Sequence, residues 1–278
     1  RSRIILKNIM SVDLEDYYYR MPFEKWDSYE SRIEISTNKI LDLFEKYNVR
    51  ATFFTLGYIA KRHPELIEKI VRLGHEVASH SYAHKEVKNM TKKDFEKDLV
   101  ESLEIIRKVS GEKPLGFRAP RFSINKNCFW AFSILKKHLV YDSSIYPVNY
   151  LKYGNPDAPR NIYSISDENP FKEDKNSDFL EIPLATLHIP SFGNFPIAGG
   201  FYLRLLPIEI ILWGIKKLNK SGNIAMCYIH PHDLDPEKPN MPNYPWHTNF
   251  KLKSSLKKFE SLLKNYSFSS VRDEILNL

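Results

Sequence analysis

The sequence contains few cysteines, and the two that are present lie far apart. Cys128 and Cys227 each stand among apolar residues, and neither has the spacing of a zinc knuckle. A small secreted scaffold held together by disulfides would need more cysteines than these. We therefore expect both to be buried thiols that behave as small apolar side chains.

Long hydrophobic runs and blocks of like charge are also absent. No apolar run approaches the roughly 20 residues that span a bilayer, so no transmembrane segment is predicted. The net charge is +7, but the lysines are dispersed over predicted helices, as in Lys92-Lys93 and Lys216-Lys217. This dispersion is typical of solvated helix faces, and nucleic-acid binding is not expected. Retention on duplex DNA that falls with salt would be the observation in its favour.

The start of the sequence bears on the compartment. Ile4-Ile5-Leu6 reads as the beginning of a strand, and no signal-peptide pattern is visible. The cytoplasm is therefore favoured, and export after removal of a presequence is the alternative. The sequence does not predict an oligomeric state.

Short apolar runs alternate with amphipathic segments, which is typical of an α/β fold with a largely parallel sheet. The predicted strands are residues 9–14, 51–55, 76–79, 115–118, 179–182 and 224–230. The predicted helices are residues 37–47, 64–73, 91–109, 125–137, 207–218 and 252–266. Residues 150–178 and 233–248 read as long irregular loops. With 278 residues and no internal repeat, we predict one domain over residues 1–278, with a barrel favoured.

A pair of histidines is the most informative motif. His80 and His84 follow the predicted strand 76–79 at an i, i+4 spacing. On a turn, this spacing places both imidazoles on one side, where they can share a metal ion. Imidazole suits zinc and its transition-metal neighbours. The pair predicts a metal site that needs a third ligand.

An acidic cluster follows the first predicted strand. Asp13, Glu15 and Asp16 lie within four residues of one another. Carboxylates behind an apolar strand are costly unless a positive charge lies near them. A metal held by His80 and His84 would supply that charge, and a solvated loop is the alternative.

Three further side chains stand at or near predicted strand ends. Arg118, in Arg118-Ala119-Pro120, can hold a carboxylate ionised. Asp142 can orient a catalytic imidazole or cap its own loop. His230 ends the apolar run 224–230 and is suited to general acid catalysis, because histidine titrates near neutral pH.

The order of these motifs resembles that of the metal-dependent polysaccharide deacetylases, carbohydrate esterase family 4. That family has an aspartate motif at a strand end, then H-S/T-x-x-H, R-x-P, a second aspartate motif and a strand ending in histidine. Here the motif core runs from residue 9 to residue 232, and residues 233–278 form a C-terminal extension. Segments 198–207, 228–231 and 247–249 are similar to a branch linked to exopolysaccharide synthesis loci.

The resemblance implies a distorted (β/α) barrel with fewer than eight complete βα units. It also implies removal of N-acetyl groups from the hexosamine units of a glycan. Asp13 would be the base, held ionised by Arg118, and His230 the acid, supported by Asp142. A backbone N–H in the Arg121-Phe122 turn would help to stabilise the oxyanion. The candidate substrate-binding residues are Pro120, Phe122, Tyr146 and Tyr202, with Tyr17, Tyr18 and Phe201 as further candidates for stacking on sugar faces.

The resemblance also implies one divalent metal ion, with zinc favoured and cobalt, nickel and manganese as alternatives. His80 and His84 would be two of its ligands. Typical members have two adjacent aspartates, whereas Leu14 follows Asp13 here, so the third ligand is Glu15 or Asp16.

Two other functions remain open on the same fold. A cyclic amide or imide hydrolase would act on hydantoin-like compounds and not on acetylated sugars. A catalytically silent carbohydrate-binding protein would have no use for a base and an acid such as Asp13 and His230.

Overall fold

The computed structural model describes residues 7–149 and 154–276. They form two compact units, and each is described by itself. Unit 1 joins residues 1–52 to residues 197–278, and unit 2 comprises residues 53–196. Within the described residues, no helix is both long and apolar enough to cross a bilayer.

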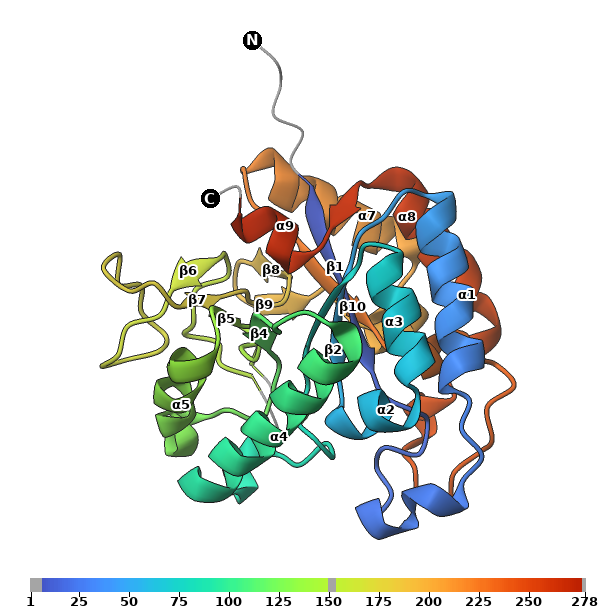
Figure 1. Cartoon of the computed structure of the whole chain (residues 1–278). Helices are drawn as coiled ribbons and strands as arrows, with labels where there is room; N and C mark the ends of the chain where they lie inside the picture. The colour runs from blue at the N-terminus through green and yellow to red at the C-terminus, as the bar shows by residue number, and fades with distance from the viewer. Residues whose placement is uncertain (1–6, 150–153, 277–278) are drawn as a thin grey trace. The chain divides into compact units, whose positions relative to one another are not determined.

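Unit 1 is built around the parallel strands β1 (Asn8–Leu14) and β10 (Met226–Ile229), with β11 (Phe268–Ser269) also paired to β1. Helices α1 and α8 contact each other beside these strands, and α7 contacts α8 (Figure 1). The helices of unit 1 are α1 (Ile33–Lys46), α6 (Gly200–Leu205), α7 (Ile208–Lys220), α8 (Leu252–Asn265) and α9 (Val271–Ile275). Its 3-10 turns are η1 (Phe23–Ser28), η5 (Pro231–Leu234) and η6 (Trp246–Thr248).

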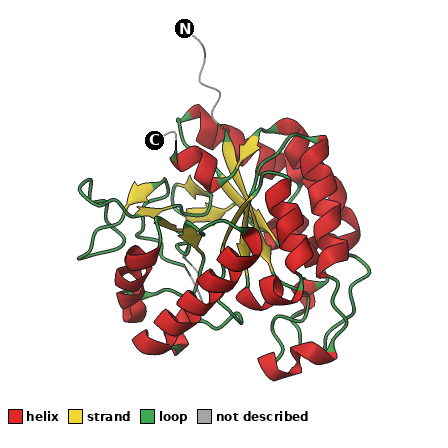
Figure 2. Ribbon diagram, viewed as in Figure 1, coloured by secondary structure: helices red, strands yellow, loops and turns green. Residues whose placement is uncertain are grey.

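Unit 2 contains a sheet in the order β2-β3-β4-β5-β7-β6, in which β3, β4, β5 and β7 are parallel to one another and β6 is antiparallel to β7. These strands are β2 (Thr52–Thr55), β3 (Glu76–Ser79), β4 (Gly116–Phe117), β5 (Tyr141–Asp142), β6 (Tyr163–Ser164) and β7 (Leu180–Glu181). A separate hairpin pairs β8 (Thr186–Ile189) with β9 (Gly193–Pro196). The short strands are surrounded by helices and long loops (Figure 2).

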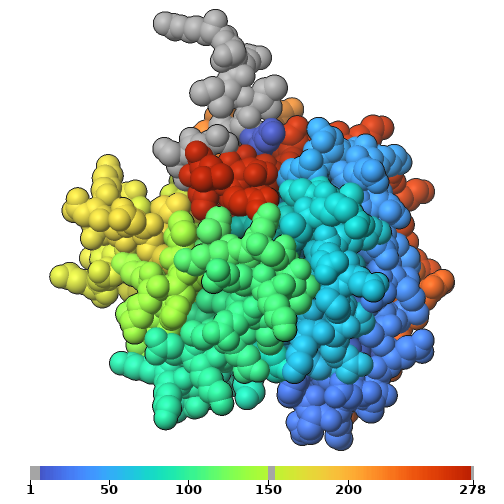
Figure 3. Space-filling model, viewed as in Figure 1, coloured from blue at the N-terminus to red at the C-terminus, as the bar shows by residue number. Residues whose placement is uncertain are grey.

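The helices of unit 2 are α2 (Gly57–Arg62), α3 (Pro64–Arg72), α4 (Lys92–Ser110) and α5 (Trp130–His138). Its 3-10 turns are η2 (Val87–Asn89), η3 (Pro120–Phe122) and η4 (Lys126–Cys128). Helix α4 begins at the predicted cap Thr91, whose hydroxyl accepts a hydrogen bond from the backbone N–H of Asp94 at 3.2 Å. It carries the exposed lysines Lys92, Lys93 and Lys97, as expected of a solvated helix. The green segment that contains α4 lies on the molecular surface in Figure 3.

The α/β class and the predicted strands are confirmed, with small shifts in their ends. Helix α1 begins at Ile33, before the predicted start at residue 37. The predicted helix 125–137 is divided into η4 and α5. The loop 150–178 includes β6, and residues 150–153 of it lie outside the described part. Both cysteines are buried thiols, as predicted.

Candidate functional site

The register of β1 and β10 brings Asp13 beside His230. Val12 pairs with Ile229 in this parallel ladder, so the next residues along the two strands are Asp13 and His230. The Oδ2 atom of Asp13 lies 3.9 Å from Nε2 of His230, and Asp13 is buried. The predicted base and the predicted acid are therefore neighbours within unit 1.

Glu15 lies beside Asp13 and His230. A tight turn, in which the Glu15 N–H donates to the Asp13 carbonyl at 3.0 Å, follows the end of β1. The Oε1 atom of Glu15 is 3.4 Å from Nε2 of His230 and 3.7 Å from Nε2 of His232. Ligand atoms of these three residues lie within 4.8 Å of one another, which makes them a candidate metal-binding group.

Asp16 has a structural role. Its Oδ2 atom accepts hydrogen bonds from the Ser31 hydroxyl at 2.6 Å and from the N–H groups of Arg32 and Ile33 at 3.0 and 3.2 Å. Its Oδ1 atom accepts from the Tyr17 N–H at 2.8 Å. Burial raises the pKa of Asp16, and these hydrogen bonds oppose that rise. Asp16 therefore caps the start of α1, which leaves Glu15 as the better candidate for the third metal ligand.

His230 is held by a residue that the sequence analysis did not single out. Its Nδ1 atom lies 2.8 Å from Oδ2 of Asp233, whose carboxylate also forms an ion pair with Arg204 at 3.0 Å. Burial opposes the charged imidazolium, but Asp233, Glu15 and Asp13 together raise the pKa of His230 to about 9. His230 is thus protonated at neutral pH.

His232 is buried and packs against two other rings. It stacks on Tyr19 at 5.3 Å and on His230 at 4.8 Å between ring centroids. Burial lowers the pKa of His232 to about 4, so its imidazole is neutral. Among the described residues, neither ring nitrogen has a hydrogen-bond partner.

In unit 2, His80 and His84 stand at the end of β3, as predicted. The expected turn is an irregular loop, because Ser81 and His84 have φ values of 68° and 58°. The Nδ1 atom of His80 lies 2.7 Å from the Arg118 carbonyl. A carbonyl only accepts, so Nδ1 carries the hydrogen and Nε2 carries the lone pair that a metal requires. The His80 and His84 ring centroids are 5.3 Å apart.

Arg118 is completely buried. Its Nε atom donates to the Ser143 carbonyl at 3.1 Å, and Nη2 donates to the Ser143 hydroxyl at 2.9 Å. Its guanidinium lies 4.1 Å from the centre of the Phe54 ring, a favourable cation–π contact. That Arg118 keeps Asp13 ionised stays a prediction.

The expected role of Asp142 needs correction, because the carboxylate at Nδ1 of His230 belongs to Asp233. Asp142 caps its own loop, the alternative left open by the sequence. It accepts from the Ser144 N–H at 2.9 Å and from the Ser144 hydroxyl at 2.7 Å. Burial, followed by the charge of Asp142, raises the pKa of Glu181 well above its usual value.

The predicted substrate-binding residues divide into two groups. Pro120, Phe122 and Tyr146 are buried, and the Phe122 and Tyr146 rings pack edge to face at 5.5 Å. A fully buried ring cannot stack on a sugar, so the prediction that Tyr146 does so is wrong. Tyr17 and Tyr18 are likewise core residues. Tyr202 and Phe201 are half-buried and remain candidates.

The predicted oxyanion turn is conformationally unusual. Arg121 and Phe122 have φ values of 55° and 51°, and left-handed backbone in residues other than glycine is uncommon. The Phe122 N–H donates to the Ala119 carbonyl at 3.0 Å, which leaves Arg121 as the better donor for an oxyanion.

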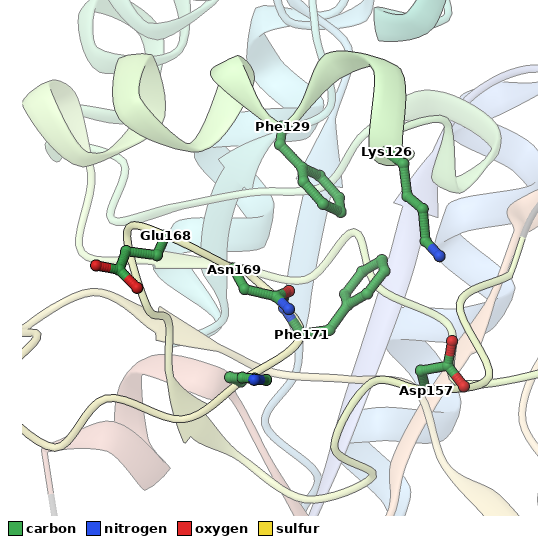
Figure 4. Close-up of a pocket in the computed structure, with 7 residues that line it drawn as sticks. Lys126, Phe129, Asp157, Glu168, Asn169 and Phe171 are labelled. Atoms are coloured by element: carbon green, nitrogen blue, oxygen red, sulfur yellow. Dashed lines mark hydrogen bonds between the residues drawn. The ribbon is translucent and has the colours of Figure 1, made fainter.

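Unit 2 also has a hollow of about 410 Å³ (Figure 4). Its lining residues are Lys126, Phe129, Asp157, Glu168, Asn169, Phe171 and Lys172. The Phe129 and Phe171 rings meet edge to face at 4.9 Å. None of the predicted catalytic or metal-binding residues lines this hollow.

Comparisons with known proteins bear on the family resemblance. Residues 23–138 match the sequence profile described as polysaccharide deacetylase, and residues 143–276 match a domain of unknown function, DUF3473. Over 214 residues the chain is 31% identical to the peptidoglycan deacetylase of Helicobacter pylori, and the alignment covers 72% of this chain and 62% of that protein.

The solved structures show the fold. A structure from Mycobacterium smegmatis assigned to the polysaccharide deacetylases has a TM-score of 0.60 at 17% identity, and the alignment covers 97% of this chain and 89% of that one. An allantoinase has a TM-score of 0.60 at 15% identity, covering 97% of this chain and 88% of that one. The predicted distorted (β/α) barrel is therefore confirmed.

The fold defines the class: a distorted (β/α) barrel, shared with both of these solved structures. Within that class, the chain contains a polysaccharide deacetylase domain, carbohydrate esterase family 4, matched over residues 23–138. The chain spans 62% of the length of the Helicobacter pylori relative.

Proposed function

We propose that the chain is a metal-dependent hydrolase that removes N-acetyl groups from the hexosamine units of a glycan. The observation that carries this proposal is the pair formed by Asp13 and His230, a buried carboxylate 3.9 Å from a protonated imidazole. Amide hydrolysis needs one group that accepts a proton from water and another that protonates the leaving amine. This pair supplies both.

The proton movements follow from these positions. Asp13 takes a proton from the water that attacks the acetyl carbonyl. His230 then gives its Nε2 proton to the departing nitrogen, so that acetate and a free amine leave. The Arg121 N–H would donate to the oxyanion.

His80, His84 and Glu15 would hold the metal ion. The fit rests on the donor chemistry: His80 presents Nε2 because its Nδ1 donates to a carbonyl, and Glu15 is a buried carboxylate. A bound divalent ion would polarise the acetyl carbonyl and lower the pKa of a water molecule. Two imidazoles and one carboxylate suit zinc, and also cobalt, nickel or manganese.

The substrate class is proposed from the relatives. The name of the Helicobacter pylori protein makes it a deacetylase of peptidoglycan, a glycan with N-acetylated hexosamines. Likeness to the allantoinase concerns the fold alone. Release of acetate from a panel of N-acetylated oligosaccharides, with bound metal quantified in the same preparation, tests this choice.

The first prediction concerns the base and the acid. Asp13→Asn and His230→Ala should each lower kcat by about 10²–10⁴-fold, the usual contribution of a general acid or base, while bound metal is retained. Acetate release and metal content are measured together. Loss of metal in Asp13→Asn equal to its loss of activity would contradict the assignment of Asp13 as the base.

A further inference from the structure

Arg204 and Asp233 lie behind His230 in unit 1. We infer that this buried pair positions His230, holding its Nδ1–H so that Nε2 faces the reacting groups. The inference rests on the proposed function, in which His230 is the acid. Both residues lie in the segment 143–276, which matches a domain of unknown function.

Asp233 holds both the side chain and the backbone of His230. Its Oδ2 atom accepts from Nδ1 of His230 at 2.8 Å and from the His230 N–H at 3.0 Å. Two donors on one oxygen fix the orientation of the imidazole relative to its own backbone. On the opposite side of the ring, Nε2 lies 3.9 Å from Asp13 and 3.4 Å from Glu15.

Arg204 fixes Asp233 in turn. Its Nη2 atom lies 3.0 Å from Oδ1 of Asp233, and both side chains are nearly inaccessible to solvent, at 4% and 2% exposure. Its Nη1 atom donates to the carbonyls of His247, Thr248 and Phe250 at 2.9, 3.2 and 2.9 Å. A guanidinium with this many partners has one available geometry, so the carboxylate that it binds is held in place.

Gly200 makes room for the pair. A Cβ atom at Gly200 would lie 1.8 Å from Oδ2 of Asp233, the oxygen that binds His230. Any side chain there would push the carboxylate away. The segments 198–207, 228–231 and 247–249, which the sequence shows as separate motifs, thus converge on the support of one histidine.

Asp233→Asn is the direct test. An amide has one accepting oxygen, so the substituted side chain can serve either Arg204 or His230 but not both. We expect kcat to fall about 10–100-fold, as for carboxylates that orient a functional histidine, with KM changed less than about threefold. In the proton NMR spectrum, the downfield Nδ1–H signal of His230, identified by its loss in His230→Ala, should shift or disappear.

Asp235→Asn is the matched control. Asp235 is also buried and binds an arginine, Arg32, at 2.6 Å, but it does not touch His230. This variant should lose stability while keeping kcat and the His230 signal. The double variant Arg204→Gln with Asp233→Asn removes the competition for the amide oxygen, so its kcat should exceed that of Asp233→Asn by about threefold or more.

The possible results distinguish failure of the positioning role from failure of the proposed function. If Asp233→Asn keeps its kcat, or if Asp235→Asn loses as much, the positioning role is wrong. An Nδ1–H signal that is unchanged in Asp233→Asn would also overturn it. If the unaltered chain releases no acetate, the proposed function fails, while the NMR comparison still decides whether Asp233 holds His230. Should Asp233→Asn not fold, the double variant, which leaves no unpaired charge, carries both measurements.

Discussion

At the scale of single residues, neighbours in the sequence have different roles. Asp13 faces His230, Glu15 faces His230 and His232, and Asp16 turns away to cap a helix. All three are buried carboxylates, and their different roles follow from the side chains and backbone groups that they contact. The sequence located the acidic cluster, but it could not assign the third metal ligand, because the partners of Asp16 come from residues 31–33.

The same limit explains why Asp233 was missed. His230 was predicted because it ends an apolar strand, which is a local signal. Asp233 follows it in a short turn and reads as an ordinary loop acid. Its role depends on Arg204, which is remote in the sequence and becomes a neighbour only through folding. His80 and His84 could be predicted because their spacing is itself the signal.

A second prediction at this scale concerns two buried carboxyl groups outside the candidate site, Glu181 and Asp142. Burial raises the pKa of Glu181 well above 4.5, and the charge of Asp142 adds to that rise. The unfolded chain therefore releases this proton at a lower pH than the folded chain does. The free energy of unfolding should fall above pH 4.5 by up to about 1.4 kcal/mol per pH unit until the folded pKa is passed.

Glu181→Gln should reduce that slope, because the amide does not titrate and can still accept from the Ile145 N–H. Burial raises the pKa of Asp142 to about 6, so part of the slope should remain below that pH. Urea unfolding between pH 5 and 8 measures the difference. The exposed variant Glu45→Gln is the control and should keep the slope of the unaltered chain. A slope as steep in Glu181→Gln as in the unaltered chain would contradict the raised pKa of Glu181.

At the scale of elements, α1 depends on a distant cap. The side chain of its N-cap residue, Arg32, makes no capping hydrogen bond, and Asp16 accepts from the N–H groups of Arg32 and Ile33 instead. The sequence offers Ser36 and Thr37 as local starting signals, so the prediction placed the helix start too late. Capping from outside the segment is invisible to local patterns.

The hydrogen bonds that cap α1 assign Asp16 a structural role, whereas the sequence left both Asp16 and Glu15 as candidate metal ligands. Asp16→Ala should lower the free energy of unfolding by about 1–2 kcal/mol, the usual effect of losing a helix cap, and should retain metal. Glu15→Ala should lose metal with a smaller effect on stability in the metal-free state. Thermal unfolding and metal analysis of both variants check this. If Asp16→Ala loses the metal and Glu15→Ala keeps it, Asp16 is the metal ligand and the assignment of Glu15 is wrong.

The strands show which elements a sequence reveals. Apolar runs such as 9–14 and 76–79 are buried along their whole length and were predicted. The hairpin β8–β9 was missed because β9 contains Gly193 and Pro196 and is only partly buried, so it lacks an alternating apolar pattern. Strand β5 has only two residues, too few for any periodicity.

At the scale of the whole molecule, the compact units do not follow the order of the sequence. Unit 1 joins the beginning of the chain to its end, and Asp13 meets His230 there. Of the segments that match the two family profiles, 143–276 contains His230 without Asp13, and 23–138 contains neither residue. Neither segment alone should retain the arrangement of base and acid.

Metal binding should be visible in the stability of the whole chain. An ion that binds only the folded state, at a free concentration of 100 times its Kd, adds about 2.7 kcal/mol. For a protein of this size, the melting temperature should rise by roughly 5–10 °C when zinc is restored to the chelated protein. Calorimetry with and without metal measures this change.

Two variants complete the thermal test. His80→Ala should show no rise when zinc is added, because it removes a ligand. Asp235→Asn should melt at a lower temperature but keep the full rise, since it leaves the ligands intact. A rise of equal size in His80→Ala would place the metal elsewhere.

The tight turn after β1 limits how the sequence can vary. Because the Glu15 N–H bonds to the Asp13 carbonyl and Asp16 caps α1 at once, three roles are packed into four consecutive positions. Inserting or deleting one residue between 13 and 16 would misplace at least two of them. Over evolutionary time this segment can exchange side chains, but its length is fixed, and libraries for directed evolution should vary residue identity there and avoid insertions and deletions.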